Sequence, residues 1–157
     1  MGKVGMDMGD DGIRIREVGS TDIEHLLDLR MEVLAAVFAD DSWDAGQLRA
    51  ENRIYYESHL GMDHVACIAT IEGIEAGCGA ICLQSEMPSP DNPSGKCAYL
   101  MNVYTRPAFR HRGVGKAAVT WLIGQAHERG AGKICLEATE AGHPFTSIWV
   151  FGPWMQW

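Results

Sequence analysis

The chain has 157 residues, of which 46% are hydrophobic and 22% charged, and its formal net charge at pH 7 is -8. This length predicts a single domain that buries a hydrophobic core, and no run approaches the roughly 18 apolar residues of a membrane span. Because the balance is acidic and basic residues gather only in one short turn, the composition argues against a nucleic-acid partner.

The first residues differ in composition from the rest. Residues 1–12 contain four Gly and three Met and lack the apolar core of a signal peptide. We therefore expect a disordered leader or a cloning remnant there, with the folded domain over residues 13–157. In residues 13–18 apolar and polar side chains alternate, which predicts a half-buried first strand.

Two helices are predicted next. Apolar residues recur at helical spacing from Ile23 to about Ala39, and Thr21 with Glu24 three residues later has the pattern of a capping box. A second, more weakly amphipathic helix is predicted over residues 45–59.

Strands follow the two helices. Residues 65–71 and 77–83 are apolar runs joined by a polar turn, which predicts a hairpin. Residues 85–95 contain three prolines and predict a loop. Residues 97–105 predict a central strand, and Asn102 within it is compatible with a bulge.

The chain is organised around residues 99–118, where this strand breaks at Arg106-Pro107 and passes into a basic, glycine-bearing turn. Helical periodicity then runs from Val114 to Gly130. A fifth strand over 133–138 and a last short helix over 145–150 complete the expected elements.

A strand, a basic glycine turn and a helix can together hold a phosphorylated ligand. Glycines let the backbone approach the phosphates, and the first-turn N–H groups point at them with the positive end of the helix dipole behind. Four side chains add positive charge around the same point: Arg110, His111, Arg112 and Lys116.

Several phosphate-binding patterns compete for this turn. A Walker-type loop fails, because Arg110 stands where its first Gly should be and Ala117 replaces its Ser/Thr. Residues 113–118 match the loose dinucleotide fingerprint Gly-x-Gly-x-x-Gly/Ala, but residues 106–112 separate them from the strand. A plain helix cap with a solvated basic face is a further alternative.

The pattern Arg110-x-x-Gly113-x-Gly115, placed after a strand and opening a long helix, resembles the signature of the GNAT superfamily of N-acetyltransferases. The resemblance covers about residues 63–153. It implies an α/β (α+β) domain with a mixed central sheet of about six strands, about four helices, and splayed strands 4 and 5. The flanking segments that carry it are residues 102–110, 136–139 and 142–145.

The resemblance implies an enzyme that moves acetyl from acetyl-CoA to a primary amine by direct attack in a ternary complex, without a metal. In this family the glycine turn wraps the pyrophosphate of coenzyme A, and the splayed strand lines its pantetheine arm and offers a backbone N–H, here that of Val103, to the acetyl carbonyl. The implied cofactor-binding residues are Val103, Tyr104, Thr105, Arg110, His111, Arg112, Gly113, Val114, Gly115 and Lys116.

Two catalytic positions follow from the resemblance. Glu137 matches a fifth-strand glutamate that acts as general base in some members, and the alternative is a carboxylate that faces solvent or pairs with Arg or Lys. Thr146 stands where many members carry a tyrosine whose hydroxyl protonates the leaving thiolate. A threonine hydroxyl is a poorer acid, so Tyr104, Ser147 or water are alternatives.

This departure keeps other functions open. Trp149, Trp154 and Trp157 crowd a tail where the family has a polar helix, as either a shifted reading frame or a real lineage difference would produce. A CoA-binding module with little or no transferase activity is therefore the main alternative. A dinucleotide-binding fragment and a purely structural domain are the others.

The acceptor and its surroundings are less defined. In the family the two N-terminal helices form one wall of the acceptor site, so Tyr55, Tyr56 and His59 either touch the substrate or serve as packing and surface residues. The acceptor is a small-molecule or peptide amine, and a homodimer is one open arrangement. Five cysteines, an odd number without a Cys-x-x-Cys pair, predict buried reduced thiols in a cytoplasmic protein.

Overall fold

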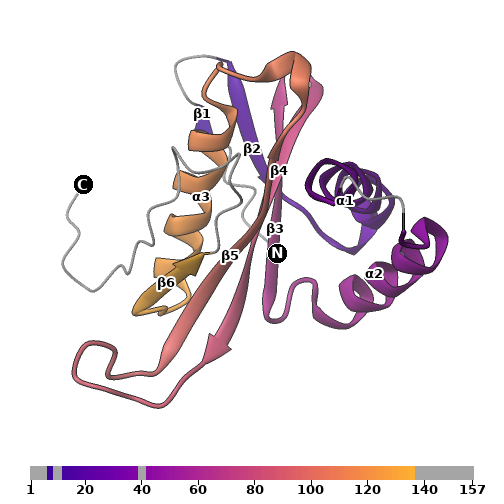
Figure 1. Cartoon of the computed structure of the whole chain (residues 1–157). Coiled ribbons are helices and arrows are strands. Elements are labelled where there is room, and N and C mark those ends of the chain that lie inside the picture. Colours follow the sequence, from indigo (N-terminus) through magenta and orange to yellow (C-terminus); the bar gives the residue numbers. More distant parts are fainter. Residues whose placement is uncertain (1–6, 9–11, 39–41, 137–157) are drawn as a thin grey trace.

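The computed structural model describes residues 7–8, 12–38 and 42–136. Within them, strands form one sheet in chain order and three α-helices cover its two faces (Figure 1). The strands are β1 (Asp7–Met8), β2 (Ile13–Glu17), β3 (His64–Ile71), β4 (Ile74–Ser85), β5 (Lys96–Thr105) and β6 (Lys133–Leu136). The helices are α1 (Ile23–Val37), α2 (Ala45–His59) and α3 (Val114–Glu128), with 3-10 turns at Ser20–Asp22 and Pro107–Phe109.

The sheet is mixed. Neighbours from β1 to β5 pair antiparallel, whereas β5 and β6 pair parallel because α3 crosses over between them. This confirms the predicted fold class, with five full strands, the two-residue β1 and three α-helices in the described part of the chain. The antiparallel neighbours do not fit the doubly wound parallel sheet of a dinucleotide-binding fragment.

Each face of the sheet has its own hydrophobic core. Along β3, Val65 and Cys67 belong to the core beneath α3, while Ala66 and Ile68 belong to the core beneath α1 and α2. β3 is therefore buried on both faces and forms the middle of the domain. No helix in the described ranges is long and apolar enough to cross a membrane.

Within the segment predicted to be a leader, Asp7 and Met8 pair with β2 as β1. One local prediction was wrong. The capping box does not form, because a 3-10 turn occupies Ser20–Asp22 and Asp22 precedes α1 without a side-chain cap bond. A hydrogen bond from the Asp22 N–H to the Gly19 carbonyl holds that turn instead.

The two strands predicted to splay apart correspond to β5 and β6, which pair parallel. β5 and β6 pair from Cys97↔Lys133 to Leu100↔Leu136. The predicted continuation of β6 and the helix predicted over 145–150 lie outside the described residues.

Two glycines of β4 permit close packing between β5 and α3. A Cβ on Gly77 would collide with the carbonyl oxygen of Tyr104 and lie 3.0 Å from Cγ1 of Val114. A Cβ on Gly79 would lie 2.8 Å from Cδ1 of Leu122. Because these two glycines have no side chain, the start of α3 and the end of β5 pack closely against β4.

Replacing Gly77 by Ala is expected to lower the free energy of unfolding by about 1–3 kcal/mol, since the backbone carbonyl it meets cannot move away cheaply. The matched control is Gly124→Ala in α3, where no atom lies within 4 Å of the added Cβ. That change should raise stability by about 0.5–1 kcal/mol through helix propensity. Urea unfolding of both variants measures the effects, and equal stabilities would contradict the packing argument.

Candidate functional site

The turn between β5 and α3 holds its backbone in unusual conformations. His111 and Gly113 have φ of 62° and 86°, in the left-handed region, and Gly113 is the N-cap of α3 without a side-chain cap bond. The first hydrogen bond of the helix runs from the Ala117 N–H to the Gly113 carbonyl at 3.0 Å. The N–H groups of residues 114–116 precede that bond, so they form the kind of helix N-terminus that binds anions.

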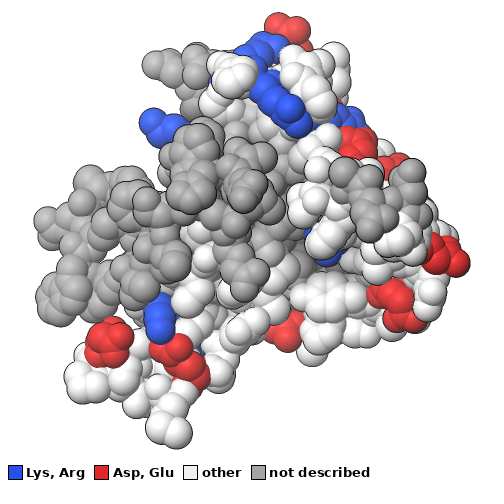
Figure 2. Space-filling model, in the orientation of Figure 1, with Lys and Arg blue, Asp and Glu red and all other residues white. Residues whose placement is uncertain are grey.

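Basic side chains surround this N-terminus. Arg110, His111, Arg112 and Lys116 are exposed, and within the described residues no ion pair ties the Arg or Lys members to a carboxylate. The guanidinium of Arg112 lies 5.8 Å from the ring centre of Phe109. Figure 2 shows Lys and Arg side chains gathered at the end of the molecule where β5 passes into α3. The predicted basic turn is therefore available to a phosphorylated ligand.

A β-bulge interrupts β5 just before this turn. Cys78 pairs with Tyr104 and Ala80 with Met101, so Asn102 and Val103 together face the single Gly79 between them. Asn102 has φ of 56°, a conformation that asparagine tolerates better than most residues. The bulge re-aims the end of the strand, since one extra residue exchanges the faces to which the following side chains point.

The three predicted pantetheine-lining residues lie in and after the bulge. Val103 is 38% exposed, whereas Tyr104 packs against the core beneath α1 and α2, where burial above all raises the pKa of its hydroxyl. Thr105 lies beside the start of α3, with Oγ1 3.7 Å from where a Cβ on Gly115 would be. The three residues therefore divide between the two faces of the sheet, and Thr105 is the one that lies next to the start of α3.

The two edges of β5 differ beyond the bulge in the described part of the chain. β6 pairs with β5 only as far as Leu100, while β4 pairs as far as Thr105. Between Met101 and Thr105, β5 thus has a described strand on one side only. Such an edge offers backbone N–H and C=O groups to an extended ligand.

A cavity of about 260 Å³ lies on the α1–α2 side of the bulge. Its walls come from α1, α2, β3 and β5, so the helix pair lines a cavity that also includes the bulge of β5. The lining residues are Arg30, Asn52, Tyr55, Tyr56, His64, Met101 and Asn102.

Arg30 carries the positive charge of this cavity. Its Nε donates to Oδ1 of Asn52 at 3.1 Å, and its Nη1 donates to Oδ1 of Asn102 at 2.9 Å. Both acceptors are neutral amides. The Asn102 contact links the cavity directly to the bulge of β5.

His64 is the most deeply buried polar residue of the cavity wall, with 3% of its surface exposed. Its Nδ1 lies 2.9 Å from the Tyr55 hydroxyl, whose other neighbour is Sγ of Cys82 at 3.7 Å. An imidazole nitrogen at the shorter distance is the better acceptor, so we assign the Tyr55 proton to this bond and the ring proton to Nε2. Nε2 has no hydrogen-bond partner among the described residues. Burial lowers the pKa of His64 to about 4, so the ring is neutral at pH 7.

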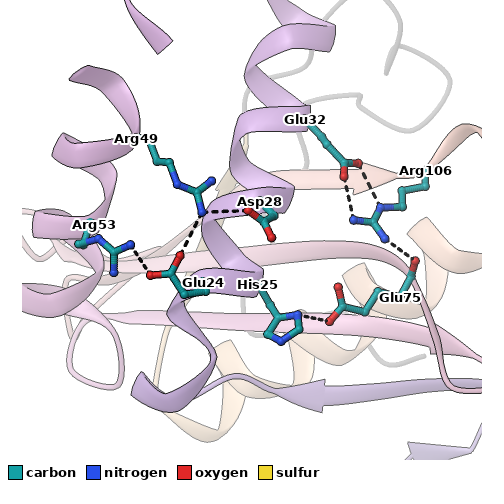
Figure 3. A network of polar contacts seen from close by, with 8 residues as sticks. All are labelled: Glu24, His25, Asp28, Glu32, Arg49, Arg53, Glu75 and Arg106. Atoms are coloured by element: carbon teal, nitrogen blue, oxygen red, sulfur yellow. Dashed lines mark hydrogen bonds and ion pairs between the residues drawn. The ribbon is translucent and has the colours of Figure 1, made fainter. Parts of the chain in front are cut away.

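Ion pairs hold the cavity walls in place (Figure 3). Glu32 of α1 accepts two hydrogen bonds from Arg106, at 2.8 and 3.1 Å, just after the end of β5. Arg49 of α2 reaches Asp28 at 2.9 Å and Glu24 at 3.1 Å, both on α1. Single exposed pairs contribute little, but the bidentate Arg106 contact and the shared carboxylates tie α1 to both neighbours.

A sequence model of the acetyltransferase (GNAT) family matches residues 27–146, well over half of the chain. The chain belongs to the GNAT family. A search of curated protein sequences found no significant match.

Solved GNAT structures resemble the whole domain. A predicted acetyltransferase from Clostridium acetobutylicum, solved with acetyl-CoA, is 25% identical with a TM-score of 0.77, over 92% of this chain and 95% of that one. A GCN5-related N-acetyltransferase from Ralstonia eutropha JMP134 is also 25% identical, with a TM-score of 0.71 over 85% and 88%. Glucosamine-6-phosphate N-acetyltransferase from Arabidopsis thaliana, at 21% identity and TM-score 0.63 over 85% and 86%, shares the fold.

The candidate residues of this GNAT domain divide into three groups. The predicted cofactor residues span the end of β5, the turn and the start of α3, and Val114 among them is buried in the core with 2% of its surface exposed, so only its backbone faces the turn. Both predicted catalytic residues, Glu137 and Thr146, lie outside the described residues. Of the three candidate acceptor residues, Tyr55 and Tyr56 line the cavity. His59 is not part of its lining and instead contacts Asp63 at 2.8 Å and stacks on Tyr55.

Sequence reasoning missed Arg30, Asn52 and His64. A signal for Arg30 exists, because it lies three or four residues from Leu26, Leu27, Val33 and Leu34 and so occupies the apolar stripe of α1. A charged residue on such a stripe is rarely buried unless it is paired with another group. Asn52 and His64 have no comparable local signal.

The cysteines of the GNAT domain match their prediction in part. All five are free thiols, and Cys67, Cys78 and Cys97 are buried. Burial raises the pKa of Cys67, and that of Cys78 to about 12, so both are protonated at neutral pH. Over the described ranges, no group of three or more His, Cys, Asp or Glu residues is arranged to hold a metal ion.

The buried His64 is expected to make the domain acid-sensitive. Between about pH 6.5, the ordinary histidine pKa, and about 4, the unfolded chain binds a proton that the folded chain does not. The free energy of unfolding should therefore fall by about 2–3 kcal/mol more in the wild type than in His64→Gln over this range. Urea unfolding from pH 4 to 7 measures it, and His59→Gln serves as the control that keeps the slope. Identical slopes in wild type and His64→Gln would contradict the assignment.

Proposed function

We propose that this protein is an N-acetyltransferase that moves the acetyl group of acetyl-CoA to the primary amine of a small molecule. The observation that carries the proposal is the continuity of three features in one stretch: the bulge at Asn102 and Val103, the edge of β5 after it, and the basic N-terminus of α3. In chain order they suit the three parts of acetyl-CoA: the thioester, the extended amide arm and the pyrophosphate.

The pyrophosphate is assigned to the start of α3. The N–H groups of residues 114–116 donate to it, and Arg110 and Lys116 neutralise its charge. The left-handed Gly113 and the side-chain-free Gly115 leave the backbone accessible at this point. The C. acetobutylicum relative, which was solved with acetyl-CoA, supports the choice of cofactor.

The pantetheine arm is assigned to the outer edge of β5. Its amides pair with the backbone between Val103 and Thr105 in the manner of an added strand. The thioester then lies at the bulge, where the N–H of Val103 donates to the acetyl carbonyl oxygen and stabilises the negative charge that develops there. Asn102, next in the chain, is also a wall of the acceptor cavity.

The chemical step is a direct attack. The lone pair of the neutral amine forms a C–N bond with the acetyl carbon, the C–S bond breaks, and the electron pair leaves with sulfur. The nitrogen loses one proton and the thiolate gains one, so the products are an amide and free coenzyme A. A proton acceptor is needed because an alkylamine with a pKa of about 10.4 is mostly protonated at pH 7.

We assign the proton acceptor to Glu137, acting directly or through water. Thr146 stands at the position of the thiolate's proton donor, and its hydroxyl is a weaker acid than a tyrosine's. A CoA-binding module without transferase activity is the alternative that this substitution favours.

Arg110→Ala combined with Lys116→Ala should weaken acetyl-CoA binding by about 2–4 kcal/mol, at about 1–2 kcal/mol for each charged hydrogen-bonding group lost. Calorimetric titration measures the change. The matched control is Arg49→Ala with Arg53→Ala, which removes the same charge at the α1–α2 ion pairs. Equal affinity in the wild type and the first double variant would contradict the pyrophosphate assignment.

Glu137→Gln should lower the turnover number by roughly 10²–10⁴-fold, the usual contribution of a general base, while acetyl-CoA affinity stays within about twofold. Release of the coenzyme A thiol with a panel of primary amines measures turnover. Binding of acetyl-CoA without any turnover by the wild type would favour the CoA-binding module instead.

A further inference from the structure

The charge of the acceptor cavity points to the chemistry of the acceptor. Arg30 is a partly buried cation in the wall, and its two hydrogen bonds go to the neutral side chains of Asn52 and Asn102. A guanidinium has five N–H donors, and the described residues provide hydrogen bonds to Nε and Nη1 but none to Nη2. Arg30 therefore has donors left over for an anionic group of a ligand.

The neighbouring carboxylates of α1 do not neutralise Arg30. Asp28 pairs with Arg49 at 2.9 Å, and Glu32 pairs with Arg106 at 2.8 Å. Both are two positions away from Arg30, and residues at that spacing point to different sides of a helix. In the part of the chain that the structure describes, no ion pair to Arg30 occurs.

The two asparagines fix the direction of the guanidinium. They engage Nε and Nη1 from two different elements, α2 and β5, and leave Nη2 and one N–H of Nη1 for a ligand. Two N–H groups at the end of a guanidinium match the two oxygens of a carboxylate or phosphate. The wall is therefore preorganised for a planar, two-point contact.

The rest of the cavity agrees with an anionic guest. Among its described lining residues no carboxylate occurs, so no side chain in the wall repels an anion. His64 adds no charge at pH 7, because burial lowers its pKa to about 4, and the neighbouring Asp63 and His59 pair with each other at 2.8 Å. The volume of about 260 Å³ is below the roughly 300–1,000 Å³ of pockets for drug-sized ligands, which favours a small guest.

Resting on the proposed function, we propose that the acceptor is a small amine that carries an anionic oxygen group, a carboxylate or a phosphate, which Arg30 binds. The contact between Arg30 and Asn102, at 2.9 Å, places the anion beside the bulge that receives the thioester. The amine must reach the acetyl carbon from there, so it lies only a few bonds from the anionic group. Amino acids and phosphorylated amino alcohols have this chemistry.

The experiment compares matched acceptors. Small amino acids are assayed against their carboxamides, and phosphoethanolamine against ethanolamine, by thiol release and by calorimetry in the presence of coenzyme A. The anionic member of at least one pair should have a kcat/KM at least about tenfold higher, and which pair responds separates carboxylate from phosphate recognition. Equal efficiency within both pairs, or acetylation of neutral amines only, would overturn the inference and leave the acetyltransferase assignment intact.

Variants tie the preference to Arg30. Arg30→Gln should abolish the preference for the anionic acceptor, and so should the nearly isosteric Asn52→Asp, which supplies Nε with an internal carboxylate. The control Arg14→Gln, which removes an exposed charge on β2 outside the cavity lining, should keep it. A preference that survives both Arg30→Gln and Asn52→Asp would overturn the role of Arg30.

Titration with acetyl-CoA distinguishes failure of the proposed function from failure of the proposed role of Arg30. Each variant is titrated with acetyl-CoA, and an unchanged dissociation constant shows that the fold is intact. If the wild type does not bind acetyl-CoA, the proposed function fails. In that case direct titration of the anionic amines still tests Arg30, and no difference between wild type and Arg30→Gln would count against it.

Discussion

The site depends on the bulge in β5, where Asn102 and Val103 face the single Gly79. The left-handed backbone of Asn102 is stabilised from two sides, since its carbonyl accepts from the Cys78 thiol at 3.4 Å and its amide accepts from Arg30 at 2.9 Å. The bulge turns the end of the strand toward the basic turn and places Asn102 in the wall of the cavity. One irregularity of a single strand thus joins the proposed cofactor surface to the proposed acceptor cavity.

Where the structure describes the chain, charged side chains are paired around α1 and unpaired at the basic turn. The chain carries a net charge of -8, yet its basic turn has no carboxylate partners among the described residues. Around α1, in contrast, Glu24, Asp28 and Glu32 are all paired with arginines from other elements. Paired charges hold the walls, and unpaired cations at the turn and at Arg30 remain for anionic ligands.

The fold and the basic turn could be predicted because their signals are local: the strand alternation, the helical period and the left-handed glycine that opens α3. The bulge was only a compatible interpretation of Asn102, because its geometry depends on pairing with β4. The capping box failed since a competing 3-10 turn at Ser20–Asp22 uses the same residues. Asn52 and His64 meet Arg30 only through tertiary packing, so no spacing in the sequence could group them.

A crystal structure with a non-hydrolysable thioether analogue of acetyl-CoA tests the central claim most directly, through the position of the ligand along β5. The account predicts the pyrophosphate on the N–H groups of residues 114–116, the pantetheine arm beside residues 103–105, and the carbonyl oxygen within hydrogen-bond distance of the Val103 nitrogen. A pyrophosphate bound away from α3, or an acetyl group far from the bulge, would contradict it.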